Sequence, residues 1–399
     1  MDKLLGTNST EAFAALKSLE KSTQFTTESD VQEWLSNILI EPICGALGYQ
    51  FQLIRSLLDQ DDQNNQMQLW ILQTLPSKND LFYDWCDRLK EIANIASSFA
   101  YEFVCFLRSV YVHYEQDAEK MSVQMLPLIF DKSIPQAIQV EIVAWLDDIL
   151  GQLDVTHEES RAFLDVLAGH FALMFPFFIQ TALATNSDVG ADFFIGESTA
   201  PFVQHYLLLG LHLLQSITMV DGWKPAPTTQ EQIEIWSNYI RSPELDFEHL
   251  RTHLLQIVCE EDDFLVSVLY KALVVYTNLR LVDFVGDPLP LTTDSLSPPS
   301  LFDYFCHVIH DDHSVLIDFL TSDETEALTY FVAFLRYLQK EWLSCTTQWK
   351  NENRYDAIIK LLQACRDELC RFDQQKIIRF DITPLLRRLD FVLSLTTAE

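Results

Sequence analysis

Apolar residues recur every three or four positions along almost the whole chain, which is the spacing of one face of an α-helix. The clearest series follows Asp80 and places a large apolar side chain on every turn: Phe82, Trp85, Leu89, Ile92, Ile95, Phe99, Phe103, Phe106 and Val110. Glycine, which tight hairpin turns between strands usually need, accounts for only 10 of the 399 residues. The spacing therefore predicts an all-α protein.

The same spacing predicts helices throughout the chain, at 31–47, 134–150, 157–182, 203–218, 228–240, 245–259, 264–284, 301–309, 324–349, 354–371 and 384–395. Short connections join most of them, as in helical hairpins that stack side by side. No repeat of fixed period is found. We therefore expect an irregular α-solenoid of stacked helical hairpins, similar to armadillo or HEAT arrays, with an extended face suited to binding protein.

The net charge of −31, from 58 acidic and 27 basic residues, limits the class of partner. A surface of that sign repels nucleic-acid phosphates and anionic lipid headgroups, and it attracts basic proteins. The acidic excess lies before residue 350, because residues 350–399 hold nine Lys or Arg and eight Asp or Glu. The composition thus favours protein partners over direct binding to nucleic acid or membrane.

Targeting and membrane signals are weak. The first ten residues contain one lysine and no apolar run, so we expect no signal peptide. None of the eight cysteines forms a C-x-x-C pair, which is typical of reduced, buried thiols. Residues 166–184 and 201–220 are uncharged and as long as a membrane span, but both contain polar side chains such as His170 and Gln204. We interpret them as core helices.

The strongest candidate for a partner-binding site is an acidic cluster in front of an apolar helix, Glu260, Glu261, Asp262 and Asp263. One interpretation is structural, because the helix dipole favours carboxylates at its N-terminus. The other is docking of a basic peptide or of an Arg-rich zinc finger. Second candidates are Asp318, which is polar on an otherwise apolar helix, and the pair Asp323 and Glu324.

One cluster has residue types that bind metal: His307, His310, Asp311, Asp312 and His313. It lies at a junction between two predicted helices, where Asp and His also serve as caps, and we favour that interpretation. The motifs of nucleotide-binding, α/β-hydrolase and zinc-protease enzymes do not occur. We therefore predict no catalytic residues, no metal, no cofactor and no small-molecule substrate.

Three segments, in order along the chain, resemble the Lines family. The first is the apolar run 254–259 that ends in the acidic cluster. The second and most specific covers 302–305, 315–325, 330–332 and 335–342, including Leu335-Arg336-Tyr337-Leu338 and Glu341-Trp342. The third is 361–370 followed by Pro384-Leu385-Leu386-Arg387-Arg388-Leu389. Family members commonly carry a long low-complexity insert before this last segment, whereas only residues 350–354 stand there in this chain.

The resemblance implies two regions, a Lines N-terminal-type region within 1–349, clearest from 254, and a Lines C-terminal-type helical module at 354–399. It also implies a non-enzymatic adaptor that regulates developmental transcription in Wingless/Wnt-linked segment polarity. Such a protein binds and restrains zinc-finger transcription regulators, and it moves between nucleus and cytoplasm. The alternative that the residues leave open is a structural scaffold subunit of a constitutive multiprotein assembly.

Overall fold

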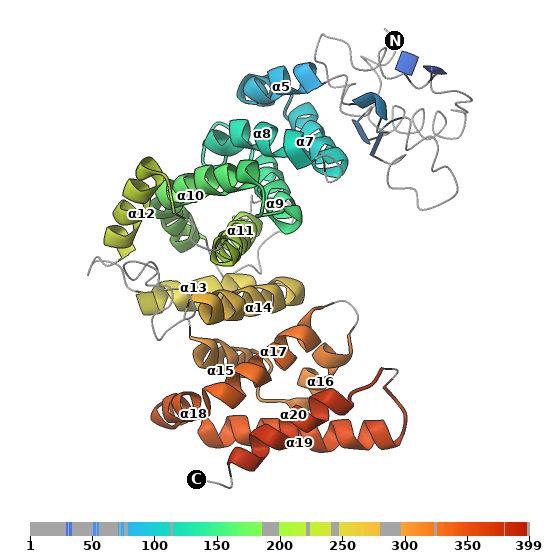
Figure 1. The fold of residues 1–399 in the computed structure, drawn as a ribbon, viewed down its shortest axis with the longest axis vertical. Coiled ribbons are helices and arrows are strands. Elements are labelled where there is room, and N and C mark those ends of the chain that lie inside the picture. The colour runs from blue at the N-terminus through green and yellow to red at the C-terminus, as the bar shows by residue number, and fades with distance from the viewer. Residues whose placement is uncertain are drawn as a thin grey trace. The chain divides into compact units, whose positions relative to one another are not determined.

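The computed structural model describes residues 79–111, 115–185, 199–220, 224–240, 247–279, 297–322, 325–378 and 380–396, with isolated residues between 29 and 75. Within these ranges the chain is helical and contains no strand, which confirms the all-α prediction (Figure 1). It divides into two compact units, 1–170 and 171–399. The boundary falls inside one long helix, α10.

The first unit is built around aromatic side chains. Phe51 stacks on Phe106 with ring centroids 4.6 Å apart, and it meets Trp85 edge to face at 6.0 Å. All three side chains are fully buried. The helices that surround them are α5 (Asn79–Asp87), α6 (Leu89–Ile95), α7 (Ser97–Tyr111), α8 (Glu115–Met125), the 3₁₀ turn η2 (Leu126–Leu128), α9 (Gln136–Gln152) and the first half of α10 (Glu158–Ala184).

The second unit contains the remainder of α10 and all later helices. They are α11 (Ala200–Met219), α12 (Pro227–Ile240), α13 (Phe247–Val258), α14 (Asp262–Leu279), α15 (Pro298–Val308), α16 (His313–Thr321), α17 (Ala327–Lys340), α18 (Trp342–Asn351), α19 (Tyr355–Gln374) and α20 (Thr383–Leu395). Helix α14 packs on α11, α15 and α17, while α17 and α19 both pack on α20.

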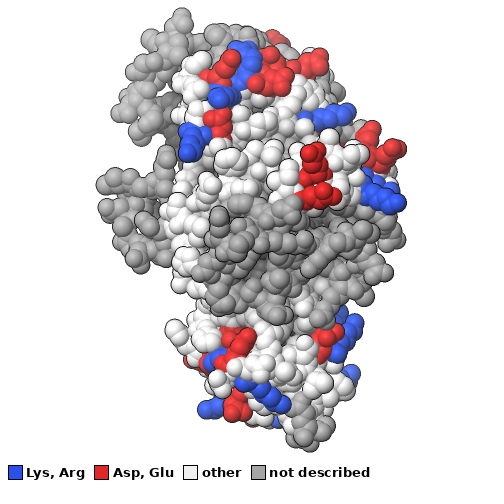
Figure 2. Space-filling model, turned by 90° about the vertical axis from the view of Figure 1, so that its left-hand side faces the viewer, with Lys and Arg blue, Asp and Glu red and all other residues white. Residues whose placement is uncertain are grey.

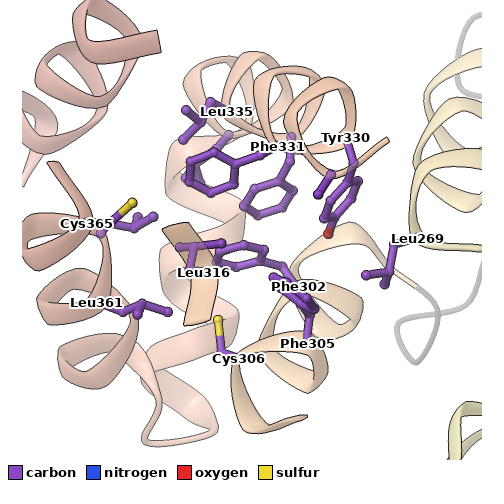
Figure 3. Close-up of a cluster of buried hydrophobic side chains, with 14 of the residues drawn as sticks. Leu269, Phe302, Phe305, Cys306, Leu316, Tyr330, Phe331, Leu335, Leu361 and Cys365 are labelled. Carbon is purple, nitrogen blue, oxygen red and sulfur yellow. The ribbon is translucent and has the colours of Figure 1, made fainter. Parts of the chain in front are cut away.

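One hydrophobic core runs through the second unit from α13 to α20 (Figure 3). Phe302 of α15 lies at its centre, stacked on Phe334 of α17 at 4.1 Å and within 6.3 Å of the Trp349 ring. Leu361 and Cys365 of α19 belong to the same cluster. The C-terminal helices therefore belong to the core of the second unit. The division of the sequence into a Lines N-terminal-type region within 1–349 and a C-terminal-type module at 354–399 remains a prediction.

Two long helices predicted from spacing are interrupted in the structure. The series after Asp80 is broken at Arg88, between α5 and α6, and again at Ala96, whose φ of −146° and ψ of 76° end α6. Glu341 separates α17 from α18 in the same way, with φ −111° and ψ 23°. At these breaks the apolar spacing continues, so the spacing alone does not predict where these helices end. The short helix α16 and the helix α8 were not predicted.

Among the described residues, α10 alone is long and apolar enough to cross a membrane by length and composition. Just over half of its most apolar window, 56%, is buried in the protein. A core helix of a soluble protein passes the same test, so this is weak evidence for a span. The cysteines described in the structure are all free, and Cys86, Cys105, Cys306, Cys345 and Cys365 are buried.

Candidate functional site

The acidic cluster lies in the tight turn that joins α13 to α14. Backbone N–H groups of Glu260 and Glu261 reach the carbonyls of Ile257 and Val258 at 3.5 Å, and α14 begins at Asp262. Asp262 and Asp263 therefore stand in the first turn of α14, where the helix dipole stabilises negative charge. All four acidic side chains are exposed, so the turn presents them together to solvent.

Partial desolvation by neighbouring atoms, and then the charge of Glu261, raise the pKa of Glu260 above its ordinary value, although its side chain is exposed. The negative charges of Glu260 and Glu261 thus repel one another. A bound lysine or arginine side chain would relieve that repulsion. The electrostatics of the turn fit a cationic ligand as well as they fit helix stabilisation, so the two interpretations remain open.

Buried contacts hold this acidic turn in place. The side-chain amide of Gln204 on α11 donates a 2.9 Å hydrogen bond to the carbonyl of Ile257, and Gln204 is 2% exposed. The Cys259 thiol donates to the Tyr304 hydroxyl of α15 at 3.7 Å. The sequence marked Gln204 only as a polar residue in an apolar run, and it gave no signal for the Cys259–Tyr304 pair. The exposed carboxylates therefore stand on a fixed support.

No described hydrogen bond or ion pair joins the second candidates, Asp318, Asp323 and Glu324, to the acidic turn. Asp318 is exposed on α16, a different helix. Asp323 and Glu324 lie outside the described residues. On the face drawn in Figure 2, described acidic and basic side chains are intermixed. Among the predicted partner-binding residues that the structure describes, the four of the acidic turn lie next to one another, and Asp318 lies apart from them.

The histidine cluster forms a helix junction. Asp312 caps α16 by accepting a 2.8 Å hydrogen bond from the backbone N–H of Ser314, as the capping interpretation predicted. His307 contacts the carbonyl of Asp303, 3.1 Å away. Among the residues described, no three histidine, cysteine, aspartate or glutamate side chains lie together as a metal would require.

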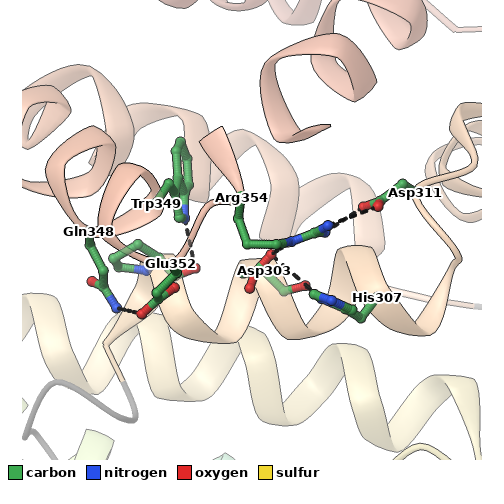
Figure 4. A network of polar contacts seen from close by, with 8 residues as sticks. Asp303, His307, Asp311, Gln348, Trp349, Glu352 and Arg354 are labelled. Atoms are coloured by element: carbon green, nitrogen blue, oxygen red, sulfur yellow. Dashed lines mark hydrogen bonds and ion pairs between the residues drawn. The ribbon is translucent and has the colours of Figure 1, made fainter. Parts of the chain in front are cut away.

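Sequence reasoning missed the main polar contact of this region, which centres on Arg354 (Figure 4). Its guanidinium binds Asp311 through two nitrogens, at 2.7 and 3.1 Å, and donates to Asp303 at 2.5 Å. The hydrogen bonds to Asp311 and then Asp303 raise the pKa of Arg354, although burial opposes them. A solitary arginine 43 residues from its main partner leaves no pattern in a sequence.

Beside this contact, Trp349 donates its indole N–H to the carbonyl of Pro299 at 3.1 Å. The side-chain amide of Gln348 donates to the hydroxyl of Ser300 at 2.5 Å and to Glu352 at 3.1 Å. These bonds fix the end of α18 and the start of α19 on α15. They make the contact region of Figure 4 a structural joint of the second unit rather than an open binding site.

Comparison with known proteins supports the resemblance. Residues 233–347 match the family model described as the Lines N-terminus. The chain is 27% identical over 157 residues to "Protein lines" of Drosophila melanogaster, covering 38% of this chain and 18% of that protein. It is 29% identical over 130 residues to "Protein Lines homolog 1" of Homo sapiens, covering 29% and 17%. No solved structure matches.

The matched part of this chain thus amounts to less than a fifth of either relative. The predicted resemblance to the Lines family is confirmed, on partial coverage of the chain. The matched range 233–347 contains the acidic turn and Asp318, as well as Asp303 and Asp311, the two partners of Arg354.

Proposed function

We propose that this chain, which carries a Lines N-terminal-type region, is a non-enzymatic adaptor that regulates development by binding a basic protein partner at the acidic turn. The resemblance supports a developmental regulator in general terms. The more specific proposal is restraint of a zinc-finger transcription regulator in Wingless/Wnt-linked patterning, in nucleus and cytoplasm. Its scaffold would be an irregular armadillo- or HEAT-like solenoid of stacked helical hairpins.

The observation that carries the proposal is the exposure of four consecutive carboxylates on a turn anchored by buried contacts. A charged surface that is already ordered loses less conformational entropy on binding than a flexible one. Zinc fingers carry the lysine and arginine needed to contact phosphate, and the same side chains suit carboxylates. Binding of this kind is steered by charge and weakens as salt rises.

A matched pair of variants tests the site. Asp262→Ser/Asp263→Ser removes two carboxylates from the first turn of α14, and Glu158→Ser/Glu159→Ser removes two from the first turn of α10. Both changes lose the same charge and the same favourable helix-dipole interaction. The probe is a purified, basic three-finger C2H2 zinc-finger module, titrated against the full chain at low and at physiological salt.

We expect the α14 variant to bind at least about tenfold more weakly, a loss of about 1.4 kcal/mol, and the α10 variant to bind as the parent chain does. Equal binding by all three proteins would remove the acidic turn from the proposal. If both variants bind the module equally weakly, the net charge of the chain, and not a defined site, would account for the loss of affinity.

A scaffold role in a constitutive assembly is the second candidate, and one observation favours it. Within the second unit, helix α10 exposes Leu173, Phe177 and Leu183 at 42–53% of their surface. Apolar association is insensitive to salt. Affinity purification of the tagged chain at two salt concentrations separates the two roles. Basic proteins that wash off at high salt support the adaptor, whereas a fixed, salt-resistant set of subunits supports the scaffold.

A further inference from the structure

The dipeptide Ser-Pro or Thr-Pro occurs three times in the chain, as Ser242-Pro243, Ser297-Pro298 and Thr383-Pro384. Protein kinases of the proline-directed class phosphorylate a serine or threonine that directly precedes proline, so each dipeptide has the sequence of an acceptor. Ser242 lies outside the described residues. The other two each stand at the start of a helix, α15 and α20, so their surroundings can be compared directly.

The Ser297 hydroxyl belongs to the contact between α15 and α18. It lies 3.2 Å from both the hydroxyl of Ser300 and Oε1 of Gln348, and the residue is only 5% exposed. Pro298 and Pro299, which follow it, are buried as well. A kinase active site can reach this hydroxyl only if α15 and α18 separate. The folded chain therefore protects Ser297 from phosphorylation.

Thr383 and Pro384 are both exposed. Their neighbours Ile382 and Leu385 are buried, so a kinase that reads an extended segment must open the first turn of α20. This turn is held weakly, because Pro384 has no N–H to donate and the residue before a proline prefers extended backbone. The N–H of Leu386 bonds to the carbonyl of Ile382 at 3.0 Å, and helix ends of this kind fray at small cost in free energy. Thr383 is therefore accessible in the folded chain.

Two charged side chains lie beside Thr383. Asp381 accepts a hydrogen bond from the Thr383 side chain and another, at 2.9 Å, from its backbone N–H, and these bonds lower the pKa of Asp381. The positive charge of Arg387 acts on the same carboxylate, which places its guanidinium near the start of α20. Arg387 is exposed and lies four residues after Thr383, the spacing at which two side chains of a helix meet.

We propose that Thr383 is the acceptor of a proline-directed protein kinase and that Arg387 binds the phosphate that results. The γ-phosphoryl group of ATP passes to Oγ1 of Thr383, its bond to the β–γ bridging oxygen breaks, ADP leaves, and a base of the kinase takes the hydroxyl proton. The phosphate carries a charge of about −1.5 to −2 at pH 7, which the first turn of a helix favours. Asp381 repels it, and Arg387 offsets that repulsion.

Phosphorylation of the folded full chain by a purified mitogen-activated protein kinase and ATP tests the acceptor, and mass spectrometry of the digested product locates the phosphate. We expect Thr383 to react at least about tenfold faster than Ser297, because only the first turn of α20 has to open. Pro384→Ala keeps the hydroxyl but removes the proline that directs the kinase, and it should abolish the reaction at Thr383. Two synthetic peptides, 293–302 and 378–388, present the same dipeptides without the fold and should react at similar rates.

Equal rates at Ser297 and Thr383 in the folded chain would overturn the proposal, because burial would then make no difference. A chain that stays unmodified at Thr383 while peptide 378–388 is phosphorylated would overturn it as well, since the first turn of α20 would then be closed to the kinase. Reaction of Pro384→Ala at the rate of the parent chain would show that the proline does not direct the modification.

Hydrogen exchange of the phosphorylated chain tests the role of Arg387. Arg387→Gln removes its charge, and Arg388→Gln removes the same charge from the adjacent, half-buried position as the matched control. Phosphorylation should slow exchange of the first amides of α20 at least about threefold in the parent chain and in Arg388→Gln, but not in Arg387→Gln. Equal slowing in all three proteins, or faster exchange in the phosphorylated parent chain, would show that Arg387 does not bind the phosphate.

Discussion

Arg354 and Asp311 form a bidentate pair that joins two helix ends, the C-terminus of α15 and the N-terminus of α19. Asp311 has a φ of 53°, and Asn353, which precedes Arg354, has a φ of 57°. The C-terminal ends of α15 and α18 thus finish in left-handed turns, a common way to stop a helix. The ion pair locks one turn against the other, and it links residues 233–347, which match the model of the Lines N-terminus, to the C-terminal helices.

Replacing Arg354 by leucine should destabilise the second unit. The change leaves the carboxylates of Asp303 and Asp311 without their cation, and the Asp303 side chain is only 15% exposed. Breaking a buried pair costs about 3–5 kcal/mol, but Asp311 is 34% exposed, so we expect a loss of about 2 kcal/mol. Urea unfolding measures it. Arg354→Lys keeps the charge but loses the two-nitrogen geometry, and it should recover only part of the loss.

Hydrogen exchange gives the sharper readout of the same variant. Amides of α19 and α20 should exchange faster in Arg354→Leu, whereas those of α7 and α9, in the other unit, should not change. Uniform acceleration in both units, or unchanged stability, would contradict the role of Arg354 as the joint between α15 and α19.

Gly210 and Phe171 form a second tight pair. A Cβ atom on Gly210 would lie 2.3 Å from Cζ of Phe171, closer than non-bonded atoms approach. The ring cannot easily retreat, because it is stacked on Tyr206 at 4.9 Å and lies 6.0 Å from Phe175. Gly210→Ala should therefore destabilise the chain by about 1–3 kcal/mol, although alanine favours a helix by about 1 kcal/mol.

A double-mutant cycle checks this explanation by thermal or urea unfolding. In a Phe171→Leu background the clash is relieved, so Gly210→Ala should become neutral or slightly stabilising. If alanine destabilises both backgrounds by the same amount, the close approach of Phe171 is not the reason that glycine occupies the position.

His170 on α10 should make stability depend on pH. Burial lowers its pKa from 6.5 to about 4, and its Nε2 has no hydrogen-bond partner among the described residues. Between pH 6.5 and 4 the unfolded chain therefore binds more protons than the folded chain. The free energy of unfolding contributed by neutral His170 is fully present above pH 6.5 and falls by up to about 3 kcal/mol as pH drops to 4.

The variant His170→Phe removes this titration. Carboxylates titrate in both proteins, so the difference between their unfolding free energies, measured from pH 7 to pH 4.5, isolates the histidine. The free energy of unfolding of the parent chain minus that of His170→Phe should decrease as pH falls. A difference that stays constant with pH would show that the histidine is solvated in the folded chain.

The sequence predicted the class of fold because helical spacing is a local property that survives in nearly every segment. It predicted the cap at Asp312 for the same reason, since the cap bonds to Ser314, two residues away. The breaks at Ala96 and Glu341 were not predicted, because apolar spacing continues through both. The Arg354–Asp311 pair was missed because 43 residues separate its members, and only folding brings them together.

The acidic turn offers a test of whether its support matters as well as its charge. Gln204 is buried on α11, and its amide donates at 2.9 Å to the Ile257 carbonyl, where α13 is about to end. Gln204→Leu keeps a side chain of similar size but removes the donor, and loss of a buried partner costs about 1–3 kcal/mol. No charge changes. If binding of the basic zinc-finger module depends on a fixed turn, this variant should bind it several-fold more weakly while keeping the same dependence on salt. Unchanged affinity in a measurably less stable variant would mean that the carboxylates act by charge alone, and that their exact placement on the turn is immaterial to the partner.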